Sequence, residues 1–159
     1  MTAMLRHGIG GKSSFLLTTT GLHSGEERTT PVILVENDGG RWLVAPYGPV
    51  GWVHNVRASQ QVTLRRGKAA EPMLAHEVGP VESGPILQQY VRNVRITAPF
   101  FDAKPEDPVE RFVEEAHRHP VFKLAGNPQH CGPRESRAIR RIRSWLSRRC
   151  IRHLFARTK

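Results

Sequence analysis

Short runs of β-branched and apolar residues, separated by glycine turns, fill the first third of this sequence. The runs cover residues 14–20, 28–37 and 41–47. Side chains of this kind suit a pleated, half-buried surface, so each run is expected to be a strand. Asp38, Gly39 and Gly40 stand between the last two runs, and glycine adopts the positive φ of a tight hairpin without steric cost. The pattern therefore predicts a three-stranded antiparallel meander over 14–47.

The next segment predicts one helix and two further strands. Residues 49–61 carry apolar side chains at helical spacing. Residues 62–78 have the composition of two strands that turn at Gly67 and Lys68. Pro72 lacks a backbone N–H, so the second of these strands is expected to lie near a sheet edge or a bulge.

Helical spacing dominates the segment that follows. Apolar residues over 86–94 recur every three or four positions, as in an amphipathic helix. After a linker at 95–107, a further helix is expected to begin with Asp107 as N-cap and Pro108 at its first position. A last strand is predicted at 119–126. Together these elements predict an α+β fold, a small and mainly antiparallel barrel of about six strands with three peripheral helices.

The positive charge of the chain is concentrated at its C-terminal end. The 159 residues carry a formal net charge of +10. Residues 134–159 hold ten Lys or Arg and one acid, which gives +9, whereas residues 1–133 hold fourteen basic and thirteen acidic residues, which gives +1. A nearly neutral body argues against a specific nucleic-acid-binding module, which needs a basic face.

We therefore predict two parts, a barrel domain at 1–130 and a basic amphipathic extension at 131–159. The apolar residues of the extension recur at helical spacing; they are Ile139, Ile142, Leu146, Cys150 and Leu154. Such a helix suits an anionic membrane surface, a partner groove or docking on its own body.

Cellular context is inferred from the cysteines and from the absence of long apolar runs. Cys131 and Cys150 form neither a disulfide framework nor a C-x-x-C metal pair. No run approaches the roughly 20 apolar residues that span a bilayer, and the start of the sequence lacks the apolar core of a signal peptide. A cytoplasmic protein is expected, with peripheral membrane contact through the extension at most.

Three motifs that suggest other chemistry are interpreted as ordinary structure. The segment 8–14, GIGGKSS, lacks the first glycine of a phosphate-binding loop. His117 and His119 are two residues apart near a helix end and face different ways, so solvated histidines are expected rather than a metal site. Glu114 and Glu115 are expected on a solvated helix face.

The bend at residues 16–32 is the best candidate for a binding site. Hydroxyl side chains and glycines surround it, and Arg28 follows it. Free backbone N–H groups, hydroxyls and an arginine together can form an anion pocket. The alternative is a threonine-rich strand with a surface arginine.

Three motifs in fixed order connect this bend to a known family. They are TTTGxxSGxxRTTP, DGGRWLVAPYG and GWVHNVRASQQVTLRRG, over residues 18–67. This order resembles the deazaflavin-dependent nitroreductase family, whose members use coenzyme F-420, and the likeness covers about residues 14–125. The resemblance implies a split β-barrel of the FMN-binding type. It also implies hydride delivery from the reduced deazaflavin to an electron-poor acceptor such as a nitroaromatic, a quinone or an enone.

The resemblance also assigns the cofactor site. It places the anionic phosphate and glutamate tail of the cofactor at the turn Leu22, His23 and Ser24, beside Arg28. It places the rest of the cofactor against Thr29, Thr30, Pro31, Val32, Ile33, Ala45, Pro46, Tyr47, Gly48, Gly51, Trp52 and Asn55.

Three departures from the family pattern affect the expected chemistry. Leu22 and His23 stand where two basic residues are common, which implies a weaker hold on the anionic tail. Phe100 and Phe101 stand where a tyrosine is expected near the substrate. The segment before the first strand is short, so a gating helix there is expected to be absent or reduced.

The proton that accompanies the hydride has several candidate sources. Tyr47, His54 and Tyr90 are the candidate donors by motif position. Each also has a structural interpretation, as pocket wall, exposed helix surface and core respectively. Solvent water is the fourth candidate.

The sequence is also compatible with other function classes. An FMN-dependent split-barrel oxidoreductase is the nearest enzyme alternative, and a non-catalytic deazaflavin carrier is another. The expected partner is a small-molecule electron acceptor. No metal is expected, and a homodimer is left open.

Overall fold

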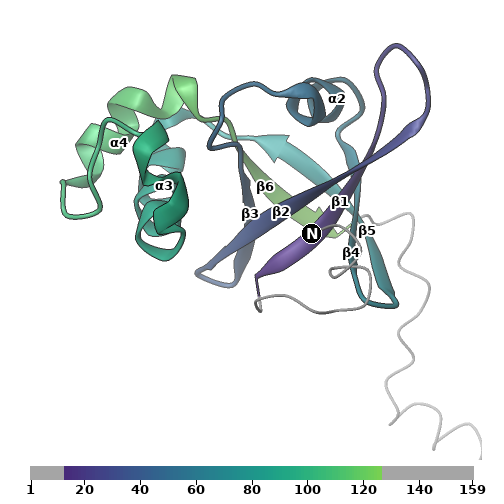
Figure 1. Cartoon of the computed structure of the whole chain (residues 1–159), viewed down its shortest axis with the longest axis horizontal. Helices are drawn as coiled ribbons and strands as arrows, with labels where there is room; N and C mark the ends of the chain where they lie inside the picture. The colour runs from purple at the N-terminus through teal and green to yellow at the C-terminus, as the bar shows by residue number, and fades with distance from the viewer. Residues whose placement is uncertain (1–12, 127–159) are drawn as a thin grey trace, which may run out of the picture. The chain divides into compact units, whose positions relative to one another are not determined.

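Six strands form a closed barrel in which every neighbouring pair is antiparallel (Figure 1). The computed structural model describes residues 13–126. Around the barrel the order is β1-β2-β3-β6-β5-β4, and β4 pairs with β1 to close the ring. The strands are β1 (Ser14–Thr20), β2 (Glu27–Asn37), β3 (Gly40–Val44), β4 (Gln61–Arg66), β5 (Ala69–Glu77) and β6 (Val121–Gly126). The predicted α+β split barrel is confirmed.

The predicted meander is present, but its third strand is shorter than expected. Asp38 and Gly39 take positive φ values of 47° and 73° in the β2–β3 hairpin. The strand expected at 41–47 ends at Val44. Beyond it the chain turns, with Gly48 at φ 81° and its N–H donating to the Ala45 carbonyl at 3.2 Å. This turn leads directly into the next helix.

Two prolines lie at strand positions for which the described residues provide a pairing partner on one side only. Pro31 of β2 is opposite Leu16 of β1, whereas the pairing of β2 with β3 begins only at Leu34. Pro72 of β5 is opposite β4, and the described pairing of β5 with β6 begins at the next residue. A missing N–H costs least where no neighbour needs it. The first half of β2 therefore has one free side in the described barrel.

In the part of the chain that the structure describes, three α-helices and two short 3₁₀ helices accompany the barrel. They are α2 (Gly51–Ser59), α3 (Pro80–Asn93), η1 (Arg95–Phe100), α4 (Val109–Glu115) and η2 (Ala116–Arg118). Within 13–126, no helix has the length and apolar character needed to cross a membrane.

The cap predicted for α4 is wrong. Pro108 occupies the cap position, and the Asp107 carboxylate instead accepts the Lys104 backbone N–H at 2.8 Å. The carboxylate thus stabilises the turn before the helix. The linker expected at 95–107 is also partly helical, because η1 occupies its first six residues.

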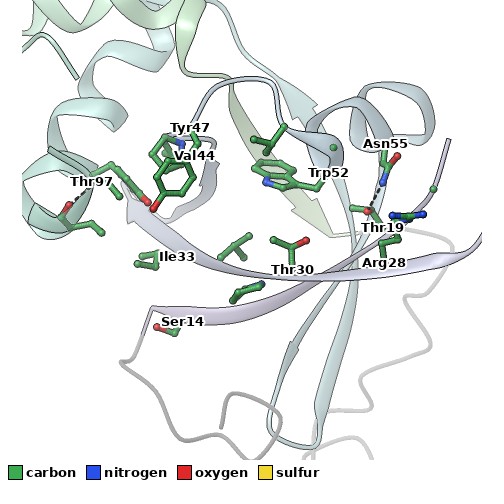
Figure 2. A pocket seen from close by; sticks show the side chains of 18 of the residues that line it. Ser14, Thr19, Arg28, Thr30, Ile33, Val44, Tyr47, Trp52, Asn55 and Thr97 are labelled. Atoms are coloured by element: carbon green, nitrogen blue, oxygen red, sulfur yellow. Dashed lines mark hydrogen bonds between the residues drawn. The ribbon is translucent and has the colours of Figure 1, made fainter. Parts of the chain in front are cut away.

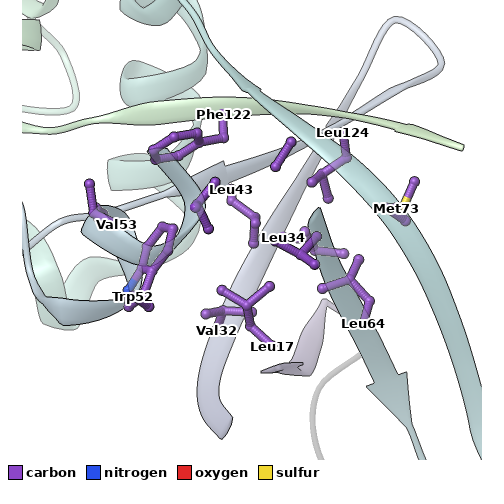
Figure 3. Close-up of a cluster of buried hydrophobic side chains, with 14 residues drawn as sticks. Leu17, Val32, Leu34, Leu43, Trp52, Val53, Leu64, Met73, Phe122 and Leu124 are labelled. Carbon is purple, nitrogen blue, oxygen red and sulfur yellow. The ribbon is translucent and has the colours of Figure 1, made fainter. Parts of the chain in front are cut away.

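Successive side chains of a strand point to opposite faces of the sheet, and they contribute to two separate hydrophobic cores. In β2, Leu34 faces the barrel interior and its neighbour Val35 faces outward toward α3. The interior core includes Trp52 and Val53 of α2, which lies over one end of the barrel (Figures 1 and 3). The outer core joins β3 and β6 to α3 and α4, where Phe112 is fully buried. Helix α3 is thereby fixed beside the free side of β2.

The predictions for the basic extension at 131–159, its helix and its two cysteines lie outside the described residues. The prediction for the segment before the first strand does so as well.

Candidate active site

A cavity of about 920 Å³ lies along the first half of β2 (Figure 2). It exists there because β3 does not pair with this half of β2. The walls come from β1, the β1–β2 turn, α2, the end of α3 and η1. The lining residues are Ser14, Thr19, Gly21, Leu22, His23, Ser24, Arg28, Thr30, Pro31, Val32, Ile33, Val44, Pro46, Tyr47, Val50, Gly51, Trp52, Asn55, Tyr90, Val94, Ile96 and Thr97.

One end of the cavity is polar and is held together by Asn55. Figure 2 shows Arg28, Thr19 and Asn55 gathered there. The buried Asn55 amide donates to the Thr19 hydroxyl at 3.1 Å and accepts the Leu22 backbone N–H at 3.0 Å. The turn itself is closed by the Gly21 N–H donating to the Glu26 carbonyl at 2.8 Å. Helix α2 thus fixes the shape of the β1–β2 turn.

Arg28 is the cation of this polar end. It opens β2 opposite Thr19 and is exposed. Its guanidinium forms no ion pair with any carboxylate in residues 13–126. Ser24, on the turn beside it, also lines the cavity. The arrangement offers an arginine and a hydroxyl to an anion.

The other end of the cavity is apolar and is built from side chains of distant segments. Figure 2 shows Tyr47, Val44 and Thr97 at this end. Tyr47 is 59% exposed and meets the Phe100 ring edge-on, with 4.7 Å between ring centres. Tyr47, Ile96 and Phe100, three of the six large apolar side chains exposed in residues 13–126, lie at this end; Val50 also lines the cavity, and Leu22 lines it at the polar end. The apolar end suits a ligand that is itself apolar.

Tyr90 contributes a hydroxyl to the apolar end. The residue is buried on α3 and lines the cavity. Burial raises the pKa of Tyr90 to about 12; Tyr47 also raises it, and Thr97 lowers it. Its hydroxyl therefore stays protonated near neutral pH and acts there as a hydrogen-bond donor.

The sequence matches a known family over most of its length. The model of the F420H2-dependent quinone reductase family matches residues 2–106. The chain belongs to this family. It is therefore an oxidoreductase that uses reduced coenzyme F-420, as the resemblance predicted.

Solved structures support the same fold. An F420-H2 dependent reductase (FDR-A) is 24% identical, with a TM-score of 0.50 over 72% of this chain and 95% of that chain. A protein described as a domain-swapped dimer is also 24% identical, with a TM-score of 0.52 over 74% and 83%. A putative pyridoxamine 5'-phosphate oxidase from Listeria innocua is 11% identical, with a TM-score of 0.50 over 78% and 88%. At these identities the likeness shows the split barrel alone.

Thirteen of the sixteen residues expected to bind the cofactor line the cavity of this F420H2-dependent reductase. They are Leu22, His23, Ser24, Arg28, Thr30, Pro31, Val32, Ile33, Pro46, Tyr47, Gly51, Trp52 and Asn55. The other three lie elsewhere. The Thr29 hydroxyl bonds that of Thr18 at 3.1 Å, Ala45 is buried in the barrel core, and Gly48 closes the turn that precedes α2.

Of the three candidate proton donors, two line the cavity and one does not. Tyr47 and Tyr90 line the cavity. His54 lies on the exposed face of α2 and does not, because the buried face of that helix carries Trp52 and Asn55. His54 is thus not brought to the site.

Two expectations for the end of α4 and the residues that follow it are wrong. Glu115 is buried rather than solvated, and its carboxylate accepts the backbone N–H groups of Asp102 and Ala103 at 2.9 and 3.3 Å. His119 is 3% exposed and stacks on Phe101. The reason is the same for both, since the 101–103 segment packs on this part of the chain. His117 is exposed as expected, and no cluster of His, Cys, Asp and Glu in the described part could hold a metal ion.

Proposed function

We propose that this enzyme reduces an apolar, electron-poor acceptor of the quinone class at the apolar end of the cavity. When bound, reduced coenzyme F-420 supplies the hydride. The observation that carries the proposal is the division of one cavity into a polar end with an exposed arginine and an apolar end with an exposed rim.

The polar end is proposed to hold the anionic tail of the cofactor. Arg28 and Ser24 offer charge-assisted and neutral hydrogen bonds to phosphate or carboxylate oxygens. Asn55 already uses its amide oxygen and nitrogen on Leu22 and Thr19, so its role is to shape the turn. The apolar walls between the two ends, from Val32 and Trp52, suit a flat ring system.

The apolar end is proposed to hold the acceptor. Ile96, Val50 and Phe100 present apolar surface at the rim, and removing it from water stabilises binding of an apolar ligand. Nitroaromatic and enone acceptors share the electron-poor character but bury less apolar surface than a quinone with a hydrocarbon tail. The rim therefore favours the quinone.

Tyr90 is proposed to stabilise the acceptor oxygen as negative charge develops on it. A hydroxyl with a pKa near 12 is a weak acid at neutral pH, so full proton transfer from it is unfavourable. A buried and fixed hydrogen-bond donor still lowers the energy of a developing oxyanion. In this scheme the proton itself comes from solvent at the cavity mouth.

Cofactor titration and turnover with defined acceptors test the proposal. Coenzyme F-420 and FMN are titrated separately against the purified chain by fluorescence. Oxidation of the reduced deazaflavin is then followed anaerobically with a quinone, a nitroaromatic and an enone. We expect tighter binding of the deazaflavin than of FMN and the highest kcat/KM with the quinone. Tighter FMN binding would favour the FMN-dependent alternative, and binding without turnover would favour a deazaflavin carrier.

A further inference from the structure

His119 is a buried histidine that the reaction scheme does not use. It is 3% exposed, and within residues 13–126 neither ring nitrogen has a partner at hydrogen-bond geometry. One face of the ring stacks on Phe101, with 4.0 Å between ring centres and planes inclined by 26°. A buried polar group without a partner costs free energy, so its presence calls for an explanation.

His119 lies behind the turn that forms the wall of the cavity. The Ala45 N–H donates to the Pro120 carbonyl at 2.9 Å, and a Cβ on Gly48 would lie 3.4 Å from the Arg118 carbonyl. The backbone of residues 45–48 thus packs against the backbone on both sides of His119. This turn carries Pro46 and Tyr47, both of which line the cavity.

Two aromatic side chains next to each other in the sequence also connect His119 with the turn that carries Tyr47. Phe101 stacks on His119, and the preceding residue, Phe100, meets Tyr47 edge-on. Packed contacts thus link the His119 ring to Tyr47 through the turn and also through the 100–101 segment.

The charged groups around the His119 ring already have other hydrogen-bond or ion-pair partners. Glu115 of α4 accepts two backbone N–H groups, while Asp102 and Arg118 form an ion pair with each other. Burial lowers the pKa of His119, and Arg118 lowers it further; Glu115, the Pro46 backbone and Asp102 raise it without reversing the shift. Since proline has no N–H, the Pro46 group concerned is its carbonyl. The uncharged ring is thus the form that this packing favours.

We propose that His119 is a positioning residue whose uncharged ring supports the turn carrying Pro46 and Tyr47. A protonated ring needs an acceptor, and the Pro46 carbonyl and the Glu115 carboxylate are the groups that favour its charged form. Neither is at hydrogen-bond geometry to the ring, so bonding to Pro46 requires the ring and the turn to approach each other, and bonding to Glu115 competes with the 102–103 backbone. Protonation therefore weakens cofactor binding. This inference rests on the proposed location of the cofactor in the cavity.

The lowered pKa of His119 determines whether folding stability rises or falls with pH. Above about pH 6.5 the histidine is neutral in both folded and unfolded chains. As the pH falls below that value, the unfolded chain takes up a proton before the folded chain does. Folding stability is therefore lost between about pH 6.5 and the lower folded pKa. Cofactor binding that depends on the uncharged ring is lost in the same direction.

The first arm of the test needs no cofactor. Histidine and tyrosine ring resonances of the full chain are followed by NMR from pH 8 to pH 5, with His119→Gln to assign the His119 signal. We expect His119 to titrate below about pH 6.5 and the Tyr47 ring signals to shift with the same midpoint. His117→Gln is the matched control, because His117 is exposed two residues away. Tyr47 signals that do not follow His119 would overturn the proposal, even if His119→Gln fails to fold.

The second arm measures the Kd of coenzyme F-420 at about pH 7.5 and about pH 5.5. We expect binding to weaken by about threefold to tenfold in the wild type and in His117→Gln, and by less than about twofold in His119→Gln. Equal pH dependence in His117→Gln and His119→Gln would overturn the proposal. Failure to bind the cofactor at any pH would instead contradict the proposed function, which the first arm does not depend on.

Discussion

The two ends of the cavity are held in place by different means. The polar end is local in sequence, since the β1–β2 turn closes on itself and one side chain from α2 fixes it. The apolar end combines β3, α3 and η1, which are far apart along the chain. The difference indicates that the polar end is set mainly by the geometry of one turn and the apolar end by packing between distant segments. Substitutions at the two ends should therefore affect different ligands.

The largest effect is expected from Arg28→Ala. Loss of a charge-assisted hydrogen bond to the cofactor tail should weaken binding by about 1.5–3 kcal/mol. The melting temperature should barely change, because Arg28 is exposed and forms no ion pair within residues 13–126. Fluorescence titration and thermal unfolding measure the two quantities. Arg65→Ala, an exposed arginine on β4, is the control. Unchanged affinity with a sharp drop in melting temperature would make Arg28 a structural residue.

Asn55→Ala should affect both folding and cofactor binding. The substitution leaves the Leu22 N–H and the Thr19 hydroxyl without their partner, and such a loss costs about 1–2 kcal/mol of unfolding free energy. Because the turn is loosened, cofactor affinity should fall as well, while the KM for the acceptor should not. Denaturant unfolding and steady-state kinetics separate these terms. A variant with full stability and full affinity would show that Asn55 does not hold the turn.

Tyr90→Phe should affect turnover and leave cofactor affinity unchanged. Removal of one hydrogen-bond donor to the developing oxyanion is expected to lower kcat by about tenfold. The aromatic ring, and with it the packing of α3, is retained. The matched control is Tyr47→Phe, which removes an exposed hydroxyl from the same end of the cavity. A kcat equal to that of the wild type would exclude Tyr90 from the chemistry.

The smallest effect on the site is expected from removal of the C-terminal extension. A chain cut after His130 should fold and bind the deazaflavin with an affinity close to that of the full chain, because all the cavity-lining residues within 13–126 lie before residue 98. We propose that the full chain, but not the cut chain, co-sediments with anionic vesicles at low salt, and that salt weakens the attachment. Loss of cofactor binding on truncation would place the extension within the functional fold.

The polar end was accessible from the sequence because its signals are local. Glycine turns and strand composition located β1, β2 and their connection, and the family motifs named Arg28 and Asn55. The contact between Asn55 and Thr19 was not predicted, since it depends on how α2 lies across the barrel. Nothing in the spacing of these two residues indicates it.

The apolar end was predicted only in part: Tyr47, Tyr90 and Phe100 were named from the sequence, and the other residues were not, for a physical reason. Val94, Ile96 and Thr97 fall in or beside a segment expected to be a linker, because a short 3₁₀ helix with Pro99 at its end has no amphipathic period. Glu115 and His119 were assigned to solvent because their burial depends on the 101–103 segment packing against them. Contacts of this kind come from tertiary structure and leave no pattern in one sequence.

Steady-state kinetics on two single variants test the central claim, that cofactor and acceptor occupy opposite ends of one cavity. Arg28→Ala alters the polar end, and Ile96→Asp places a charge on the exposed apolar rim, where Ile96 is 82% exposed. The account predicts that Arg28→Ala raises the KM for the reduced deazaflavin alone and that Ile96→Asp raises the KM for a quinone alone. Equal effects of either substitution on both KM values would contradict it.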